Sequence, residues 1–96
     1  MSAYAGYIYK ITNNVTGKIY VGKRQKSEFD KYYWGSGTHI SNSIKLYGVE
    51  NFSREVIEWC YTVDDLLTKE RFWIATLDAK NPDVGYNLAD GGWAQQ

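Results

Sequence analysis

The first part of the chain contains two short runs of aromatic and β-branched residues, at positions 7–12 and 18–22. The intervening residues, 13–17, are rich in asparagine and end in glycine, which is typical of a turn. Successive strand side chains point to opposite sides, so Tyr7 and Tyr9 share one face of the first run. The pattern predicts a β-hairpin closed by a short loop.

Two later segments repeat their apolar residues every three or four positions, as a helix does. Residues 39–47 form the first of them, and Gly48 ends the pattern. Residues 63–77 form the clearer helix, because Thr62 is a good N-cap residue and acidic residues follow in the first turn. Residues 52–59, rich in valine, isoleucine and aromatic side chains, predict a third strand.

The remaining segments read as connections. Residues 23–38 are polar, aromatic and glycine-containing, which predicts a long loop of the kind that is often functional. Residues 85–88 predict either a short strand or an ordered loop. The element order favours one α+β domain over residues 1–96, with a small antiparallel sheet of about three strands flanked by helices.

Composition excludes several kinds of site. The chain has one cysteine, Cys60, and one histidine, His39, so an internal disulfide, a thiol-based zinc site and a multi-histidine metal site are all excluded. Cys60 follows an apolar residue and is interpreted as a small buried hydrophobe. No signal peptide and no apolar run of membrane-spanning length is present. We therefore expect no membrane partner and a reducing, cytoplasmic compartment.

Charge is divided unevenly along the chain. The net charge is zero, but residues 1–48 carry seven basic and two acidic side chains, whereas residues 49–96 carry four basic and nine acidic ones. The basic half is suited to a polyanion, although chance clustering on a solvated surface gives the same count.

Glu70 lies within the apolar stripe of the predicted helix 63–77, since positions 63, 67, 70, 74 and 77 share one face. An ionised carboxylate is costly to bury unless it is paired or holds a metal. One interpretation is a structural salt bridge to a lysine or arginine, or a face rotated toward water. The other is a metal ligand, because Mg²⁺ needs only one or two protein carboxylates.

Tyr9 and Tyr20 lie eleven positions apart on the two arms of the predicted hairpin, so they can meet across it. A cross-strand aromatic pair is a common packing feature. The residues around the two tyrosines also resemble a known signature. YIY at 7–9 and YVG at 20–22 resemble the two halves of the signature of the GIY-YIG nuclease family, with Tyr7 in place of the first glycine.

The resemblance extends along nearly the whole chain. ERFWI at 70–74 resembles the helix segment that carries the family's metal-binding glutamate, and GYN at 85–87 resembles the late segment with its asparagine. YWGSG at 33–37 and IKLYG at 44–48 look most like the phage-encoded branch, which includes homing endonucleases and free-standing relatives.

The resemblance implies metal-dependent hydrolysis of DNA phosphodiester bonds. By this resemblance Glu70 would hold one Mg²⁺ or Mn²⁺ ion near the scissile phosphate. Tyr9 or Tyr20 would orient or deprotonate the attacking water, which a tyrosine of ordinary pKa does poorly at neutral pH. Asn87 would hold active-site groups by hydrogen bonds.

One family feature is displaced. The family has a phosphate-binding arginine early in the first helix after the second tyrosine motif, where this chain has Asp30 and Lys31. Candidates for the phosphate contact are Arg24, Lys23, Lys31 and His39. Arg24 with Lys23 is favoured, because both follow the second strand directly and arginine forms two parallel hydrogen bonds with phosphate.

DNA is the expected partner, and its binding should weaken as salt rises. The basic side chains expected to contact DNA are Lys23, Arg24, Lys26, Lys31 and Lys45. The chain is interpreted as an excised catalytic domain or a compact protein whose loops give specificity, acting in a bacterial or phage-infected cell. A monomer would nick, and double-strand cleavage would need a dimer or a second visit. Two alternatives stay open: a non-catalytic nucleic-acid-binding module that keeps the fold, and a structural α+β domain with a tyrosine-rich core.

Overall fold

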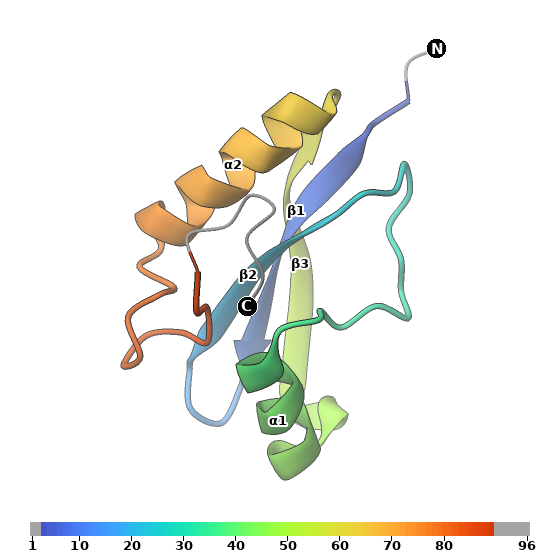
Figure 1. Cartoon of the computed structure of the whole chain (residues 1–96). Helices are drawn as coiled ribbons and strands as arrows, with labels where there is room; N and C mark the ends of the chain where they lie inside the picture. Colours follow the sequence, from blue (N-terminus) through green and yellow to red (C-terminus); the bar gives the residue numbers. More distant parts are fainter. Residues whose placement is uncertain (1–2, 90–96) are drawn as a thin grey trace.

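The computed structural model describes residues 3–89 as a sheet with helices on both faces (Figure 1). The expected elements are all found, with bounds that shift by at most two residues. The elements are β1 (Gly6–Asn13), β2 (Ile19–Arg24), α1 (Thr38–Tyr47), the short 3₁₀ helix η1 (Val49–Asn51), β3 (Phe52–Cys60) and α2 (Val63–Thr76).

The sheet has the order β2-β1-β3, and both pairings are antiparallel. Tyr9 lies opposite Gly22 on β2 and opposite Val56 on β3. A register shift between Ile8 and Tyr9 interrupts the β1–β3 ladder. The prediction of an α+β fold with about three antiparallel strands is therefore confirmed, and β2 lies at an edge of the sheet.

The hairpin turn is fixed by the side chain of Asn13, which is fully buried. Its Oδ1 accepts hydrogen bonds from the backbone N–H groups of Val15 (2.9 Å) and Thr16 (3.2 Å). Gly17 has a φ of 81°, a left-handed conformation that glycine adopts without steric cost. The turn residues named from the sequence thus set the register that brings Tyr9 beside β2.

The outer edge of β2 is covered in part by the segment that follows α2 (Figure 1). Ile19 donates its N–H to Val84 O (3.1 Å) and accepts from Tyr86 N (2.8 Å), and Gly85 forms one parallel bridge with Ile19. Residues 85–88 are therefore an ordered loop with a single bridge rather than a strand.

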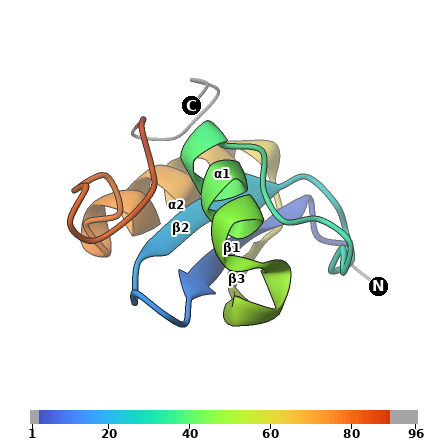
Figure 2. The same ribbon diagram turned by 90° about the horizontal axis from the view of Figure 1, so that it is seen from below.

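Two hydrophobic clusters pack on opposite faces of the sheet. The face toward α1 contains Tyr7, Tyr9, Ile11, Tyr20, Ile40 and Phe52. The face toward α2 contains Ile8, Val21, Cys60, Leu66, Ile74 and Ala79, so Cys60 is buried as expected. Figure 2 shows α1 on one side of the strands, and α2 on the other.

Helix α2 begins as the sequence predicts, since Thr62 Oγ1 accepts from Asp65 N at 3.0 Å. Its buried stripe is narrower than expected and consists of Leu66, Glu70 and Ile74. The expectation that Val63 belongs to the stripe is wrong, because its side chain in the first turn is 38% exposed. Glu70 is buried within this stripe, which rules out the alternative of a face rotated toward water.

Among residues 3–89, no helix is long and apolar enough to cross a membrane.

Candidate active site

The alternation of side chains along β2 distributes the candidate residues over both faces of the sheet. Tyr20 packs in the cluster on the α1 face, and Val21 packs in the cluster on the α2 face. By the same alternation, Gly22 and Arg24 lie on the α1 face with Tyr20, and Lys23 lies on the α2 face with Val21. The site is therefore built around an edge strand rather than on one surface.

The two tyrosines predicted to meet across the hairpin do so. Tyr9 and Tyr20 are 3% and 4% exposed, and their ring centroids are 6.2 Å apart. The Tyr9 ring crosses β2 at Gly22, where an added Cβ would come within 2.3 Å of the Tyr9 hydroxyl oxygen. Glycine at this position is what lets the tyrosine side chain lie across the strand.

The loop between β2 and α1 covers the tyrosine pair. A Cβ at Gly35 would lie 3.2 Å from the Tyr20 ring, and one at Gly37 would lie 3.0 Å from it. Tyr33 from the same loop meets the Tyr9 ring edge-on, with centroids 5.9 Å apart. The two loop glycines thus allow close packing over a pair of hydroxyl-bearing rings.

Burial strongly disfavours the phenolate form of both tyrosines. Burial is the main cause of a rise in the pKa of Tyr20 to about 12, and electrostatic interactions with Tyr33 and Glu70 contribute to that rise. The pKa of Tyr9 is raised well above its ordinary range, again chiefly by burial and then by Tyr20 and Tyr33. Both side chains are consequently neutral hydroxyls at neutral pH.

Glu70 reaches the edge of β2 from α2, on the face opposite the tyrosines. Its side chain is 5% exposed and accepts a hydrogen bond from Lys23 Nζ at 3.0 Å. This ion pair is one of the two interpretations open from the sequence. Glu70 also raises the pKa values of Tyr9 and Tyr20, which places its charge within electrostatic reach of both.

Arg24, at the end of β2, is held by the loop that follows it. Its Nη2 donates to Asp30 Oδ2 at 2.8 Å, and its guanidinium carbon lies 4.1 Å from the centre of the Tyr33 ring. Its Nε is buried and donates to no acceptor within the described part of the chain. Asp30 has a lowered pKa, because the bond from Arg24 favours its carboxylate.

Asn87 binds the middle of β2 through its side chain and is 3% exposed. Its Oδ1 accepts from Val21 N at 2.9 Å, and its Nδ2 donates to Val21 O at 2.8 Å. The amide therefore pairs with the outer edge of the strand as a neighbouring strand would. Val21 lies between Tyr20 and Gly22, so Asn87 fixes the strand segment that carries the tyrosine site.

No family model matches the chain. Known relatives are proteins of Enterobacteria phage T4. "Putative endonuclease segB" is 38% identical over 90 residues, and "Endonuclease segA" is 35% identical over 86 residues. The alignments cover 91% and 90% of this chain but 40% and 38% of those proteins, so the chain spans about two fifths of the relatives' length.

Solved structures similar to this chain also come from an endonuclease. The catalytic domain of the intron endonuclease I-TevI, in a mutant form, superposes with a TM-score of 0.73 at 27% identity, covering 93% of this chain and 98% of that one. A second structure of the catalytic domain of this homing endonuclease has a TM-score of 0.69. In sequence and in fold the chain is similar to phage endonucleases and to the catalytic domain of a homing endonuclease, in agreement with the GIY-YIG resemblance of its motifs.

The fold brings together only some of the residues expected at the site. Tyr9, Tyr20 and Asn87 converge on β2, and Lys23, Arg24 and Glu70 adjoin them. His39 lies exposed in the first turn of α1. It lines a groove of about 410 Å³ that also includes Lys18, Tyr86 and Asn87.

The other expected DNA contacts are exposed. Lys26 lies 3.6 Å from Asp30 through its Nζ, and Lys31 lies 5.3 Å from the centre of the Tyr32 ring. Lys45 is in the last turn of α1. The basic side chains expected to contact DNA therefore come from three elements, which are strand β2, the loop that follows it and helix α1.

A divalent cation fits Glu70 only as a partly hydrated ion. Within residues 3–89 no three His, Cys, Asp or Glu side chains come together to form a cage. Mg²⁺ typically keeps several waters and uses one or two carboxylates together with phosphate oxygens. Glu70 supplies one such carboxylate, and the neighbouring cations Lys23 and Arg24 are suited to bind phosphate. The residues present therefore fit a hydrated Mg²⁺ ion that also binds a phosphate group.

Two residues at the site were missed from the sequence, Tyr33 and Arg54. Tyr33 lies between Arg24 and Tyr9, and Arg54 on β3 binds the loop that carries Tyr33. The sequence places Tyr33 in an aromatic run inside a loop and Arg54 in a strand. Neither position reveals contacts that depend on how the loop folds back.

Proposed function

We propose that this chain is a GIY-YIG domain and the catalytic part of a metal-dependent DNA endonuclease that hydrolyses phosphodiester bonds. The observation that carries the proposal is the buried carboxylate of Glu70, which lies across one edge strand from the buried Tyr9–Tyr20 pair. The relatives named as endonucleases support the same activity. Residues 1–96 would act as one domain.

Glu70 would hold the cation, Mg²⁺ or Mn²⁺, which as a Lewis acid supplies positive charge for the scissile phosphate. The tyrosines would act as hydrogen-bond donors. Because burial keeps Tyr9 and Tyr20 protonated, their hydroxyls can orient the attacking water or a phosphate oxygen. A tyrosine serves as a base only where a positive charge lowers its pKa, and Lys23 and Arg24 are the cations on the same strand.

Arg24 is the proposed phosphate ligand in place of the displaced family arginine. The Arg24 side chain is 33% exposed, and its Nε–H has no protein acceptor among the described residues, so the guanidinium keeps a donor that is not used within the protein. Its bond to Asp30 and its stacking on Tyr33 fix the guanidinium plane. Lys23 would add a point charge from the other face of β2, and His39 would contact the strand along its groove.

DNA is the proposed substrate, with Lys26, Lys31 and Lys45 contributing sequence-independent phosphate contacts. One site in each chain cuts one strand, so a monomer nicks and two copies are needed for double-strand cleavage. The phage relatives favour action inside an infected bacterial cell. Asn87 would support catalysis indirectly, by holding β2 in place.

A non-catalytic DNA-binding module is the second candidate. The observation in its favour is that Lys23 and Arg24 each bind a carboxylate, as in a purely structural network. In that case removing Glu70 would reduce stability and leave DNA binding without cleavage.

Nicking of supercoiled plasmid separates the two candidates. The protein is incubated with plasmid and Mg²⁺, and the open circular form is quantified over time. Glu70→Ala and EDTA serve as the two controls, with the folded state of the variant checked by circular dichroism. Nicking that disappears in both controls supports the endonuclease. Retarded plasmid without nicks, with Mg²⁺ and with Mn²⁺, overturns it.

A further inference from the structure

Arg54 binds the loop between β2 and α1 from β3, the edge strand on the opposite side of the sheet from β2. It lies opposite Ile11 in the β1–β3 ladder, on the face that carries the tyrosines. Its Nη1 donates to Tyr33 O at 2.6 Å, and its Nη2 donates to Lys31 O at 2.7 Å. Backbone carbonyls are ordinarily satisfied by secondary structure, and here an arginine takes that place.

Two aromatic rings hold the same guanidinium. Its central carbon lies 3.8 Å from the centre of the Trp34 ring and 5.2 Å from that of Phe29. The planar group thus donates hydrogen bonds in its plane and contacts ring faces, a combination that lysine cannot reproduce. Arg54 is positioned to fix residues 29–34 as a unit.

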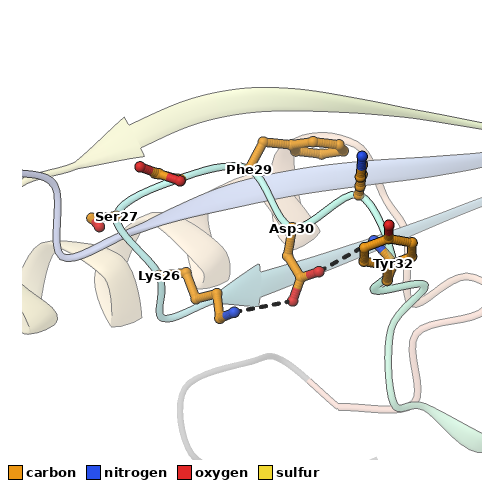
Figure 3. A pocket seen from close by; sticks show the side chains of 7 residues that line it. Lys26, Ser27, Phe29, Asp30 and Tyr32 are labelled. Atoms are coloured by element: carbon orange, nitrogen blue, oxygen red, sulfur yellow. Dashed lines mark hydrogen bonds and ion pairs between the residues drawn. The ribbon is translucent and has the colours of Figure 1, made fainter.

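The loop that Arg54 fixes carries the partners of Arg24. Asp30 accepts from Arg24, Tyr33 stacks on Arg24, and Tyr33 also meets the ring of Tyr9. Asp30 has a second anchor on the sheet, because its N–H donates to the Tyr7 hydroxyl at 3.0 Å. Figure 3 shows Asp30 turned toward Lys26 and the backbone of Tyr32, with Phe29 on the other side of the loop.

We infer that Arg54 is a positioning residue for the proposed phosphodiester cleavage, acting through the loop on Arg24. Without the Arg54 contacts the loop carbonyls of Lys31 and Tyr33 turn to water, and Tyr33 no longer keeps its place between the guanidinium of Arg24 and the ring of Tyr9. The inference rests on the proposed function for its kinetic consequence. Its structural consequence, an ordered loop at residues 29–34, stands independently.

The first test measures loop order and does not depend on cleavage. Amide hydrogen exchange is followed by mass spectrometry for wild type, Arg54→Lys and Arg54→Met, with Arg71→Met as the matched control. Arg71 is an exposed arginine on α2. Exchange in peptides covering residues 29–34 should rise at least tenfold in both Arg54 variants and stay unchanged in the control. Unchanged exchange in the Arg54 variants overturns the inference.

The second test distinguishes positioning from a general loss of stability. Plasmid nicking is measured, well below the unfolding temperature, for Arg24→Ala, Arg54→Met and the double variant. Arg54→Met should lower kcat at least tenfold and change KM for DNA less than threefold, and the double variant should be no slower than Arg24→Ala. If the rate of the double variant fell by the product of the two single-variant factors, Arg54 would not act through Arg24. A wild type that does not nick refutes the proposed function, while the exchange result still decides the role of Arg54.

Discussion

The two faces of β2 present opposite chemistry within a single strand. On the α1 face, Tyr20 and Tyr9 are neutral hydroxyls packed under a loop. On the α2 face, Lys23 and Glu70 form an ion pair that is nearly buried. Strand geometry alone produces this division, because adjacent residues point to opposite sides. The comparison shows that one edge strand can place buried hydroxyl groups on one side of a sheet and an ion pair on the other.

The largest effect should come from filling the space at Gly22. In Gly22→Ala the added Cβ meets the Tyr9 side chain, and overpacking in a buried site costs about 3 kcal/mol. We expect that loss in chemical denaturation, together with nicking at least about 100-fold slower. Gly17→Ala is the control, since nothing lies near its Cβ and only the turn is strained. Full nicking activity in Gly22→Ala would show that the tyrosine face is dispensable.

Removing the hydrogen bonds between the Asn87 amide and Val21 should destabilise β2 and with it the residues on both of its faces. Asn87→Ala leaves the buried N–H and C=O of Val21 without their side-chain partners, at a cost of about 2–3 kcal/mol of unfolding free energy. Asn87→Asp keeps the acceptor but loses the donor, so it should not restore stability. An Asn87→Ala protein as stable as wild type in urea would contradict a clamping role.

Alkaline pH tests the tyrosine face separately. The pKa of Tyr20 is about 12 in the folded protein and about 10 when unfolded, so the unfolded chain loses its proton first. The stability from this shift is complete below pH 10 and declines as pH rises toward 12, by about 2 kcal/mol. Urea titrations across this range should show a smaller decline for Tyr20→Phe. Parallel declines in the two proteins would contradict the burial of this hydroxyl.

The ion pair on the α2 face should show a smaller coupling. A thermodynamic cycle over Lys23→Met and Glu70→Gln should give about 1–2 kcal/mol, because both side chains are largely shielded from water. The exposed pair of Lys10 and Glu55 is the control and should give about 0.5 kcal/mol or less. Equal coupling in the two pairs would mean that the Lys23–Glu70 bridge is an ordinary surface contact.

Local patterns in the sequence were sufficient to predict the elements. Period-two and helical spacing located the strands and helices, and the turn residues around Asn13 and Gly17 located the hairpin. The same spacing identified Glu70 as an acid on an apolar face. These features depend on interactions between residues close in sequence, which a pattern records directly.

The contacts made by the loop between β2 and α1 could not be predicted from such patterns. Arg24 was expected to contact phosphate, but its partners within the protein, Asp30 and Tyr33, come from a loop without periodicity. The sequence identified Arg54 only as a residue of a strand. The backbone carbonyls that it binds come close to it only in the folded structure. The pairing of Lys23 with Glu70 joins residues 47 positions apart, and only the packing of α2 against the sheet brings them together.

Plasmid nicking by Tyr20→Phe, Glu70→Gln and the double variant tests most directly whether the two faces of β2 serve one reaction. If they act on the same phosphodiester, each single change slows Mg²⁺-dependent nicking by about 100-fold or more, and the double variant is hardly slower than the worse single variant. Wild-type rates in either single variant, or losses that multiply in the double variant, would contradict a shared site.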